Sequence, residues 1–515
     1  MYILSSRCIV NDSENVLPVI AQARRHGERV AAIDAQGACT YNALLGASEC
    51  VAAALLAGQG DLNEQRVAFL IPPSVSWIAT FWGIWRAGGI AVPLPLHSAR
   101  PELEYILEDT GAAVLVYDAS TAAVAEPILQ DRGIVGIRYE SIAPGAQALL
   151  PQLTPDRRAM ILYTSGTTNK PKGVVTTHAT ITAQITTLIE AWEWRSDDRI
   201  PLFLPLHHVH GIINVVSCAL WSGAMVEMMP RFDVEVVWGR IASGELTLLM
   251  AVPTIYHRLI AAWEAASPER QAELSRGCGK LRLTVSGSAA LPVSTLEHWK
   301  KISGHVLLER YGMTEIGMAI SNSYRGRRIP GSVGNPLPGV EVQLTAEDGS
   351  LVPPDTPGEI EVRGPSVFQE YWGKPEATRN AFRNGWFRTG DTAVFENGAY
   401  RILGRSSIDI LKTGGHKVSA LEIEEELRQH PAIVECAVVG VPDEEWGERV
   451  AAALILRPGT SLDLPALREW ARERLSAHKL PSLLMTLDAL PRNAMGKVLK
   501  PAITKLFVQA GKSAS

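Results

Sequence analysis

The chain has 515 residues, of which 46% are hydrophobic and 20% are charged, and its formal net charge is -5. A chain of this length exceeds what one hydrophobic core usually supports, so we expect two or more domains. The slightly acidic balance excludes the basic character of proteins that bind nucleic acids or anionic membranes. No apolar run approaches the roughly 20 residues that cross a bilayer. We therefore expect a globular protein with neither a nucleic-acid nor a membrane partner.

The N-terminal segment and the cysteines favour a cytoplasmic location. Residues 1–14 lack the basic start and long apolar core of a secretory signal. Arginines in the first 30 residues leave a mitochondrial site open, but Asp12 and Glu14 count against a transit peptide. The cysteines have no CxxC pairs, which favours buried free thiols over zinc or disulfides. They are Cys8, Cys39, Cys50, Cys218, Cys278 and Cys436.

Two predicted strand-and-helix pairs open the chain. Residues 66–71 form an apolar β-rich run that precedes an amphipathic stretch over 77–85, and residues 113–117 precede a helical stretch over 122–130. This alternation is typical of α/β proteins whose sheets are largely parallel and covered on both faces. We therefore predict an α/β fold class.

A hydroxyl-rich loop with glycines spans residues 163–173 and follows the apolar run 159–162. Its hydroxyl and backbone NH groups can bind phosphate oxygens, and its lysines can offset phosphate charge. The Walker A spacing is absent, because Val174 stands where that motif needs a lysine. An ordinary polar turn is the alternative. The candidate ATP-binding residues in this loop are Thr164, Ser165, Gly166, Thr167, Thr168 and Lys172, with Lys170 beside them.

Residues 330–372 change character, because prolines and glycines separate alternating strands such as 359–363. This spacing predicts an antiparallel, β-rich subdomain over about 330–404.

The last hundred residues predict a compact α+β unit. Its expected elements are helices over 420–429 and 464–475 and strands over 434–439 and 449–456. We place the boundary after Gly404, which gives an N-terminal core over 1–404 and a C-terminal domain over 405–515.

Residues 165–173 resemble the shared motif of the adenylate-forming superfamily, which groups acyl-CoA synthetases, peptide-synthetase adenylation domains and beetle luciferases. The motif Ser-Gly-Thr-Thr-Gly-x-Pro-Lys-Gly is matched except that Asn169 replaces a glycine. Asparagine tolerates a left-handed backbone well, so this departure is mild. The resemblance implies a large N-terminal domain of two α/β subdomains with packed, mostly parallel sheets and a β-rich subdomain, followed by a small mobile α+β lid.

Residues 311–315, Tyr-Gly-Met-Thr-Glu, resemble the superfamily's Tyr-Gly-x-Thr-Glu. There the ring stacks on adenine, the threonine hydroxyl meets the α-phosphate and the glutamate holds magnesium. One or two oxygen ligands suffice for a Mg²⁺ ion that keeps most of its waters, so Glu315 is the metal candidate. A helix-initiating Thr-Glu pair is the alternative. The ATP-binding residues that the resemblance implies outside the loop are Ser288, Tyr311, Gly312, Thr314, Asp391 and Arg405, the last two as ribose contacts.

Residues 491–497, Pro-Arg-Asn-Ala-Met-Gly-Lys, resemble the C-terminal catalytic lysine motif of the superfamily. Lys497 would bridge the carboxylate and α-phosphate oxygens as charge builds during displacement of pyrophosphate. Without this frame, an exposed lysine near a C-terminus would simply be solvated.

The resemblance also implies a rotating lid. Ser407 occupies the pivot position, where relatives usually carry Asp or Lys. Gly414 and Gly415 would let the pantetheine thiol of CoA approach the adenylate, because paired glycines permit close backbone approach. Lys412 is the third CoA-binding candidate.

The acyl pocket of this superfamily is assembled from segments that correspond here to residues 207–214, 285–292 and Met313. The first segment lacks the Asp that usually pairs an amino-acid substrate, which weakens the peptide-synthetase interpretation. Its clustered histidines also suggest metal ligands, but no partner carboxylate stands nearby. The pocket candidates are His207, His210, Asn214, Gly287 and Met313. The catalytic candidates are His208, Thr314, Glu315 and Lys497.

Residues 204–211, 285–292 and 309–318 resemble malonyl-CoA synthetases more closely. A dicarboxylate keeps one ionised carboxylate in the pocket after the other is activated, and this is costly unless a cation pairs it. Arg258 and Arg282 are the candidate anchors. Alternatively, Arg282 is structural and Arg258 caps a helix.

The resemblance thus predicts an ATP-dependent ligase that joins malonate, or methylmalonate, to CoA through an acyl-adenylate. ATP, Mg²⁺ and CoA are the expected cofactors and co-substrates, and small molecules are the expected partners of a monomer or weak homodimer. The alternatives are a ligase for short or medium monocarboxylates, transfer to a carrier-protein thiol, and a nucleotide-binding regulator without turnover. The intact Lys497, Glu315 and Asp391 argue against the regulator.

Overall fold

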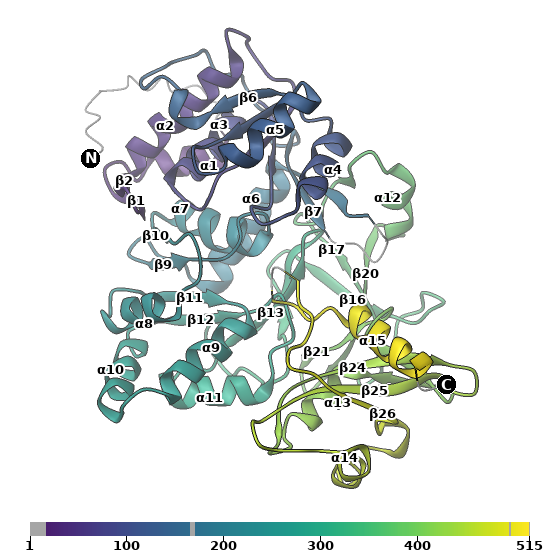
Figure 1. Cartoon of the computed structure of the whole chain (residues 1–515). Coiled ribbons are helices and arrows are strands. Elements are labelled where there is room, and N and C mark those ends of the chain that lie inside the picture. The colour runs from purple at the N-terminus through teal and green to yellow at the C-terminus, as the bar shows by residue number, and fades with distance from the viewer. Residues whose placement is uncertain (1–16, 165–169, 494–495, 514–515) are drawn as a thin grey trace.

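The computed structural model describes residues 17–164, 170–493 and 496–513. It is a mixed α/β structure with a large N-terminal part and a small C-terminal part, which lies at the lower right of Figure 1. Five separate sheets form its framework. The predicted ATP-binding residues Ser165, Gly166, Thr167 and Thr168 lie outside the described residues, as does Asn169.

A seven-stranded sheet in the order β18-β8-β7-β4-β3-β5-β6 supports the first α/β unit. Its strands are β3 (Arg66–Leu70), β4 (Ile90–Pro93), β5 (Val114–Tyr117), β6 (Val135–Arg138), β7 (Arg158–Thr164), β8 (Lys172–Thr177) and β18 (Glu370–Tyr371). Strands β3 to β7 pair in parallel, and only β8 and β18 join antiparallel. Nearby helices are α2 (Tyr41–Leu56), α3 (Val75–Arg86), α4 (Arg100–Thr110), α5 (Ala122–Arg132) and the 3-10 turn η1 (Tyr139–Ser141). The strands and helices predicted from the alternating pattern are confirmed.

A four-stranded sheet in the order β2-β1-β10-β9 is also mainly parallel. Its strands are β1 (Val30–Asp34), β2 (Gly37–Thr40), β9 (Arg199–Leu202) and β10 (Met225–Met228). The helices of this region are α1 (Pro18–Arg24), α6 (His178–Trp192), the π-helix η2 (His210–Ser217) and α7 (Cys218–Ser222).

The third sheet, in the order β11-β12-β13-β14-β15, positions most of the candidate site. Its strands are β11 (Leu248–Ala251), β12 (Leu283–Ser286), β13 (Leu308–Met313), β14 (Gly317–Ser321) and β15 (Asn335–Pro336). The accompanying helices are α8 (Val234–Ala242), α9 (Pro253–Glu264), α10 (Pro268–Cys278) and α11 (Val293–Ser303). Because β11, β12 and β13 are parallel, their carboxyl ends meet at one edge of the sheet.

The β-rich part that follows is antiparallel, as predicted. It consists of β16 (Glu341–Thr345), β17 (Gly358–Arg363), β19 (Phe382–Arg383), β20 (Trp386–Glu396) and β21 (Ala399–Arg405), with helix α12 (Pro375–Ala381).

The C-terminal part, which we call the cap, is built on a sheet in the order β23-β22-β25-β24 with β26 beside β25. Its strands are β22 (Ile410–Thr413), β23 (His416–Ser419), β24 (Ile433–Asp443), β25 (Gly447–Leu456) and β26 (Leu483–Thr486). Its helices are α13 (Ala420–Leu427), α14 (Leu464–Ala471), the 3-10 turn η3 (Ala477–Lys479) and α15 (Lys500–Ser513). The boundary at 404/405 remains a prediction.

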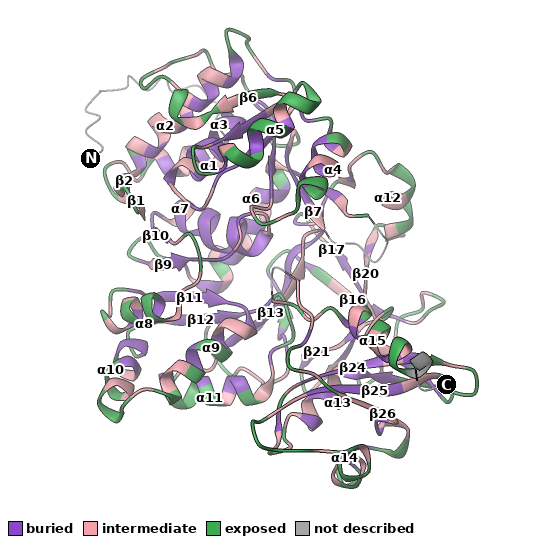
Figure 2. Cartoon of the chain, viewed as in Figure 1, coloured by how far each residue is buried: buried purple, intermediate pink, exposed green. Residues whose placement is uncertain are grey.

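Helix α3 lies in the core and is buried along nearly its whole surface (Figure 2). Its aromatic side chains Trp77, Phe81 and Trp85 pack in series, and Trp85 makes a T-shaped contact with the ring of His178, with centroids 5.4 Å apart. A helix that is apolar all round is stable only when it is enclosed. His178, at the start of α6, is therefore held in apolar surroundings.

His178 should make stability depend on pH. Burial lowers its pKa from 6.5 to about 3, so the unfolded chain binds a proton more readily than the folded one, and stability is lost as pH falls below the unfolded pKa. From about pH 8 to about pH 5, we expect this group to reduce the free energy of unfolding by about 2 kcal/mol. Urea unfolding at both pH values measures this loss. The loss of unfolding free energy between the two pH values should be smaller by that amount in His178→Gln than in the wild type. An identical pH response in the variant would contradict the assignment.

Candidate active site

The carboxyl edge of β11, β12 and β13 gathers candidate residues from distant parts of the sequence. Ala251 of β11 is in register with Ser286 of β12, which is in register with Glu309 of β13. The residues that follow each strand therefore emerge side by side. These are Thr254 at the start of α9, Gly287 and Ser288 after β12, and Tyr311, Gly312, Met313, Thr314 and Glu315 at the end of β13.

Ser288 links this edge to the π-helix η2. Its backbone adopts a left-handed φ of 69°, which is uncommon for a residue other than glycine and is often found at functional sites. Its Oγ lies 3.2 Å from Nδ1 of His210, the first residue of η2. Asn214, one turn further on, is buried, and its Nδ2 has no hydrogen-bond partner among the described residues.

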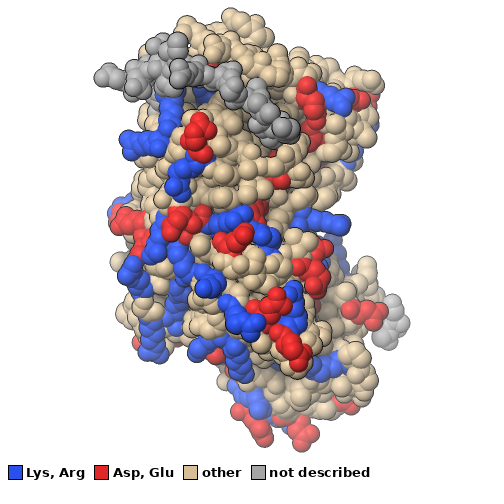
Figure 3. Space-filling model, turned by 90° about the vertical axis from the view of Figure 1, so that its left-hand side faces the viewer, with Lys and Arg blue, Asp and Glu red and all other residues tan. Residues whose placement is uncertain are grey.

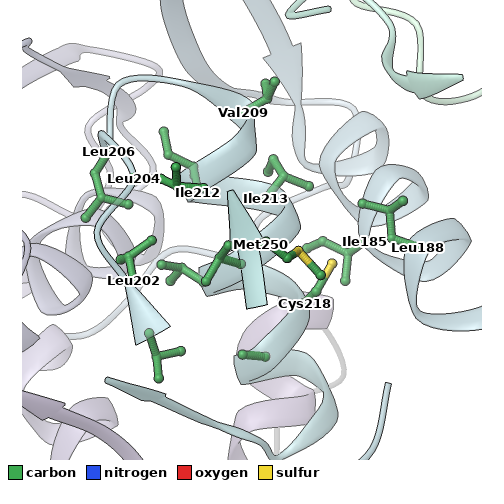
Figure 4. Close-up of a cluster of buried hydrophobic side chains, with 14 of the residues drawn as sticks. Ile185, Leu188, Leu202, Leu204, Leu206, Val209, Ile212, Ile213, Cys218 and Met250 are labelled. Carbon is green, nitrogen blue, oxygen red and sulfur yellow. The ribbon is translucent and has the colours of Figure 1, made fainter. Parts of the chain in front are cut away.

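Packing of apolar side chains in the hydrophobic core holds η2 in place. Figure 4 shows Ile212 and Ile213 of η2 within the same cluster as Ile185 of α6 and Met250 of β11. Both isoleucines are almost fully buried. Because π-helical turns are rare and occur frequently at functional sites, this packing indicates that the orientation of His210 and Asn214 is built into the fold.

The three clustered histidines are neutral at physiological pH. Burial lowers the pKa of His207 to about 3 and that of His208 to about 4. Burial, together with nearby Arg310, also lowers the pKa of His210 well below its usual value. No group of three or more metal-ligating side chains occurs in the described part of the chain. Pocket lining by these histidines stays a prediction.

Asp391 of β20 is held between two other nucleotide candidates. The Tyr311 hydroxyl donates to its Oδ2 at 2.6 Å, and Arg405 Nε donates to its Oδ1 at 3.0 Å. Residues from β13, β20 and β21 thus meet at one point. The carboxylate keeps further lone pairs for ligand hydroxyls.

Glu315 lies close to the candidate Lys172 and to Tyr371, which the sequence did not single out. The Tyr371 hydroxyl donates to its Oε1 at 3.0 Å, and the Nζ of Lys172 lies 4.9 Å from the centre of the Tyr371 ring. Burial raises the pKa of Glu315, because the charge of the carboxylate is poorly compensated there. A buried oxygen ligand with this deficit fits a Mg²⁺ ion. Thr164 faces Lys172 across the β7-β8 pair, at the two ends of the hydroxyl-rich loop.

The cap brings the Lys497 segment to the same edge of the sheet. A side chain on Gly496 would lie 2.9 Å from Oγ1 of Thr254, so the backbone just before Lys497 lies against the start of α9. The NH of Asn493 donates to the carbonyl of Lys497 at 2.9 Å. Lys497 itself is exposed.

The CoA candidates lie elsewhere on the cap. Gly414 and Gly415 form the turn between β22 and β23, and both have left-handed φ values of 53° and 79°. The NH of Gly414 donates to the carbonyl of Trp446, whose ring is 3.0 Å from where a side chain on Gly414 would begin. Lys412 is exposed near this turn, and Ser407 lies in the connection from β21 to β22.

Comparison with known proteins identifies the family. Residues 19–372 match the sequence profile of the AMP-binding enzyme family, and residues 422–497 match that of the AMP-binding enzyme C-terminal domain. The chain belongs to the AMP-binding enzyme family.

Several relatives of this AMP-binding enzyme span nearly its whole length. The mitochondrial malonate–CoA ligase ACSF3 of Mus musculus is 43% identical over 537 residues, which cover 97% of this chain and 92% of that protein. A malonate–CoA ligase of Arabidopsis thaliana is 40% identical over 485 residues, which cover 87% of this chain and 79% of that protein. The crystal structure of ATP-bound MatB from Rhodopseudomonas palustris has a TM-score of 0.87 and 34% identity, covering 95% of this chain and 99% of that one. The predicted adenylate-forming fold is confirmed.

Arg282 of this AMP-binding enzyme, a predicted acyl anchor, forms hydrogen bonds with other residues of the protein. Its Nε and Nη2 donate to the two carboxylate oxygens of Asp198 at 2.7 and 2.5 Å, and its Nη1 donates to the carbonyl of Trp192. Its guanidinium also lies over the Tyr324 ring. The structure therefore supports the alternative that Arg282 is structural.

Arg258, the other predicted anchor, is exposed on α9. Its guanidinium lies over the ring of Phe232, 4.7 Å from the ring centre. An exposed, stacked arginine is a weaker anchor than a buried one, because water screens its charge.

Arg310 is the residue that sequence reasoning missed. It stands on β13 directly before Tyr311 and is only 3% exposed. Gly287 adjoins it so closely that any side chain there would collide with the guanidinium. The Nε and Nη2 atoms of Arg310 have no hydrogen-bond partner among the described residues. The only sequence signal was its place inside the segment 309–318.

Charged side chains of both signs occur on the surface. Figure 3 shows basic and acidic side chains interspersed on one face of the molecule. None of the helices that the structure describes combines the length and apolar character needed to cross a bilayer.

Replacing Arg282 should destabilise the protein without changing substrate affinity. In Arg282→Met the Asp198 carboxylate, whose side chain is only 1% exposed, would lose its partner, so we expect a loss of about 3 kcal/mol in the free energy of unfolding. Urea unfolding and the KM for the acid substrate measure the two effects. The exposed Arg195 is the matched control, and Arg195→Met should cost less than about 0.5 kcal/mol. A KM for the acid substrate raised tenfold in a stable Arg282→Met variant would instead show that Arg282 binds the substrate.

Proposed function

We propose that the protein is an ATP-dependent malonate–CoA ligase that works through malonyl-adenylate and releases pyrophosphate and AMP. Its family membership, the malonate–CoA ligases among its relatives and the ATP-bound solved structure support this function. Methylmalonate is a second candidate acid. We further infer that Mg²⁺ and CoA are used, since Glu315 fits a metal ion and the cap carries the glycine turn.

The single observation that carries the choice of a dicarboxylate is the buried guanidinium of Arg310, whose Nε and Nη2 have no partner among the described residues. Burial lowers its pKa to about 9, so it stays charged at neutral pH. A buried charge without a counter-ion costs several kcal/mol, and a carboxylate is the geometric match for a guanidinium. The second carboxylate of malonate supplies that partner, whereas acetate or octanoate leaves the charge uncompensated once its only carboxylate is activated.

The pocket around Arg310 is otherwise consistent with a small polar acid. Neutral His210, the Asn214 amide and the Ser288 hydroxyl can donate or accept hydrogen bonds, and Gly287 packs against the guanidinium where any side chain would collide with it. Met313 is the last residue of β13.

In the first half-reaction, a malonate carboxylate oxygen attacks the α-phosphorus of ATP and the bond to pyrophosphate breaks. Asp391 and Arg405 would hold the ribose beside the Tyr311 ring. The Thr314 hydroxyl and the Lys497 ammonium would stabilise negative charge on the phosphate and the entering carboxylate. When bound at Glu315, Mg²⁺ would neutralise charge on the polyphosphate.

In the second half-reaction, the cap would turn about Ser407 so that Gly414 replaces Lys497 at the sheet edge. The CoA sulfur then attacks the carbonyl carbon, the bond to AMP breaks, and the thiol proton passes to solvent. Transfer to a carrier-protein thiol would use the same geometry, and a thioester assay with both acceptors separates the two.

A monomer or weak homodimer and a cytoplasmic location remain predictions, whereas the murine relative is named mitochondrial.

An acid panel tests this proposal. Pyrophosphate release should be far faster with malonate than with acetate or octanoate at equal concentration. Arg310→Met should lower kcat/KM for malonate about 30-fold or more, because the bound carboxylate loses a buried partner worth about 2 kcal/mol or more. It should not destabilise the ligand-free protein, since an unpaired buried charge has been removed.

Arg258→Met provides the comparison within the same panel. If this variant loses malonate selectivity while Arg310→Met keeps it, the anchor is Arg258. A preference of the wild-type enzyme for octanoate would refute the malonate assignment. If no acid forms an adenylate although ATP binds, the protein is the nucleotide-binding regulator.

A further inference from the structure

Lys500 is a buried lysine that the proposed mechanism does not use. It begins α15, three residues after Lys497, and is only 8% exposed. Its Nζ lies 2.6 Å from Oδ1 of Asp409 and 2.7 Å from Oε1 of Glu424. Lysine is almost never buried unless it is paired, so this three-residue group, which we call the Lys500 bridge, needs an explanation.

One end of the Lys500 bridge is fixed to the framework of the cap. Glu424 lies on α13, and its Oε1 also accepts a hydrogen bond from the NH of Val438 on β24 at 2.8 Å. Its Oε2 pairs with Arg428 at 3.1 Å. The position of Glu424 is thus set by both a helix and a strand of the cap.

The other end of the Lys500 bridge, Asp409, lies at the proposed pivot. The Oδ2 of Asp409 accepts a hydrogen bond from the NH of Arg405 at 3.0 Å, and the NH of Asp409 donates to the carbonyl of Arg405 at 2.7 Å. Ser407 lies inside the turn that these two bonds close. Gly404 lets the turn close, because a side chain there would collide with Cβ of Asp409.

The pairing favours the charged forms of Lys500 and Asp409. Burial acts to lower the pKa of Lys500, but Glu424 and Asp409 outweigh it and raise that pKa above its usual value. Burial acts to raise the pKa of Asp409, but Lys500 outweighs it and lowers that pKa. Buried ion pairs contribute little net stability compared with apolar packing, so orientation is the better reason for this one.

We propose that Lys500 is a positioning residue for Lys497, an inference that rests on the proposed roles of Lys497 and Ser407. The bridge fixes the distance between the pivot turn, which contains the ribose contact Arg405, and the segment that carries Lys497. Three residues span at most about 10 Å, so a shift of Lys500 would also displace Lys497. A displacement of about 1 Å at a catalytic group can cost 100-fold in rate.

The expected effect is confined to adenylate formation. Lys497 acts in that step, whereas thioester formation uses the Gly414 turn at another end of the cap. Loss of the bridge should therefore slow the first half-reaction and spare the second. A purely structural ion pair would instead change stability, or change both half-reactions alike.

The test compares two variants that weaken the bridge with one control. Asp409→Asn keeps the shape and leaves Lys500 paired with Glu424, so it should fold. Lys500→Met removes the bridge altogether. Lys505→Met removes an exposed lysine from the same helix. The readouts are single-turnover pyrophosphate release with ATP and malonate, transfer from preformed malonyl-adenylate to CoA, and urea unfolding.

We expect Asp409→Asn and Lys500→Met to slow pyrophosphate release about 10- to 100-fold, with transfer to CoA within about threefold of the wild type and Lys505→Met unchanged in both steps. Equal slowing of both half-reactions, no slowing in a folded Asp409→Asn, or the same effect in Lys505→Met would overturn the inference. Variants are compared with wild type on whichever acid the wild type activates, so failure of the malonate assignment is seen separately, in the wild-type panel.

Discussion

The parallel pairing of β11, β12 and β13 is the constraint on which the rest of the site depends. It brings the residues after Ala251, Ser286 and Met313 to one edge, although they are far apart in sequence. The β-rich part then adds Asp391, and the cap adds the Lys497 segment at the start of α9. Substrate activation needs donors, cations and reacting atoms within a few ångströms of one another, and this edge is where they converge.

Charge compensation inside the protein separates structural from ligand-binding groups. Arg282 is paired with Asp198, Arg405 with Asp391, and Lys500 with two carboxylates. Arg310 is more deeply buried than Arg282 or Arg405, yet its Nε and Nη2 have no partner among the described residues. Since an uncompensated buried charge is costly, the simplest account is that the substrate supplies the missing carboxylate. The same principle makes Glu315, whose pKa burial raises, a fitting ligand for a cation.

The sequence predicted the fold class, the main strands and helices and the motif-bearing segments, because hydrophobic periodicity and short motifs are local properties. It did not single out Arg310, since burial without a partner depends on the packing of Gly287 from a neighbouring strand. It offered Arg282 as an anchor, because nothing local reveals a partner as distant in sequence as Asp198. The Lys500 bridge was missed for the same reason, as its members come from three elements of the cap.

The most direct test of the account is single-turnover pyrophosphate release by Lys497→Ala, measured beside transfer from preformed malonyl-adenylate to CoA. The account predicts that release falls about 100- to 1000-fold, the usual cost of removing one electrostatic stabiliser, while transfer proceeds at nearly the wild-type rate. Release at the wild-type rate would contradict it, because the Lys497 segment would then lie at the sheet edge without taking part in the chemistry there.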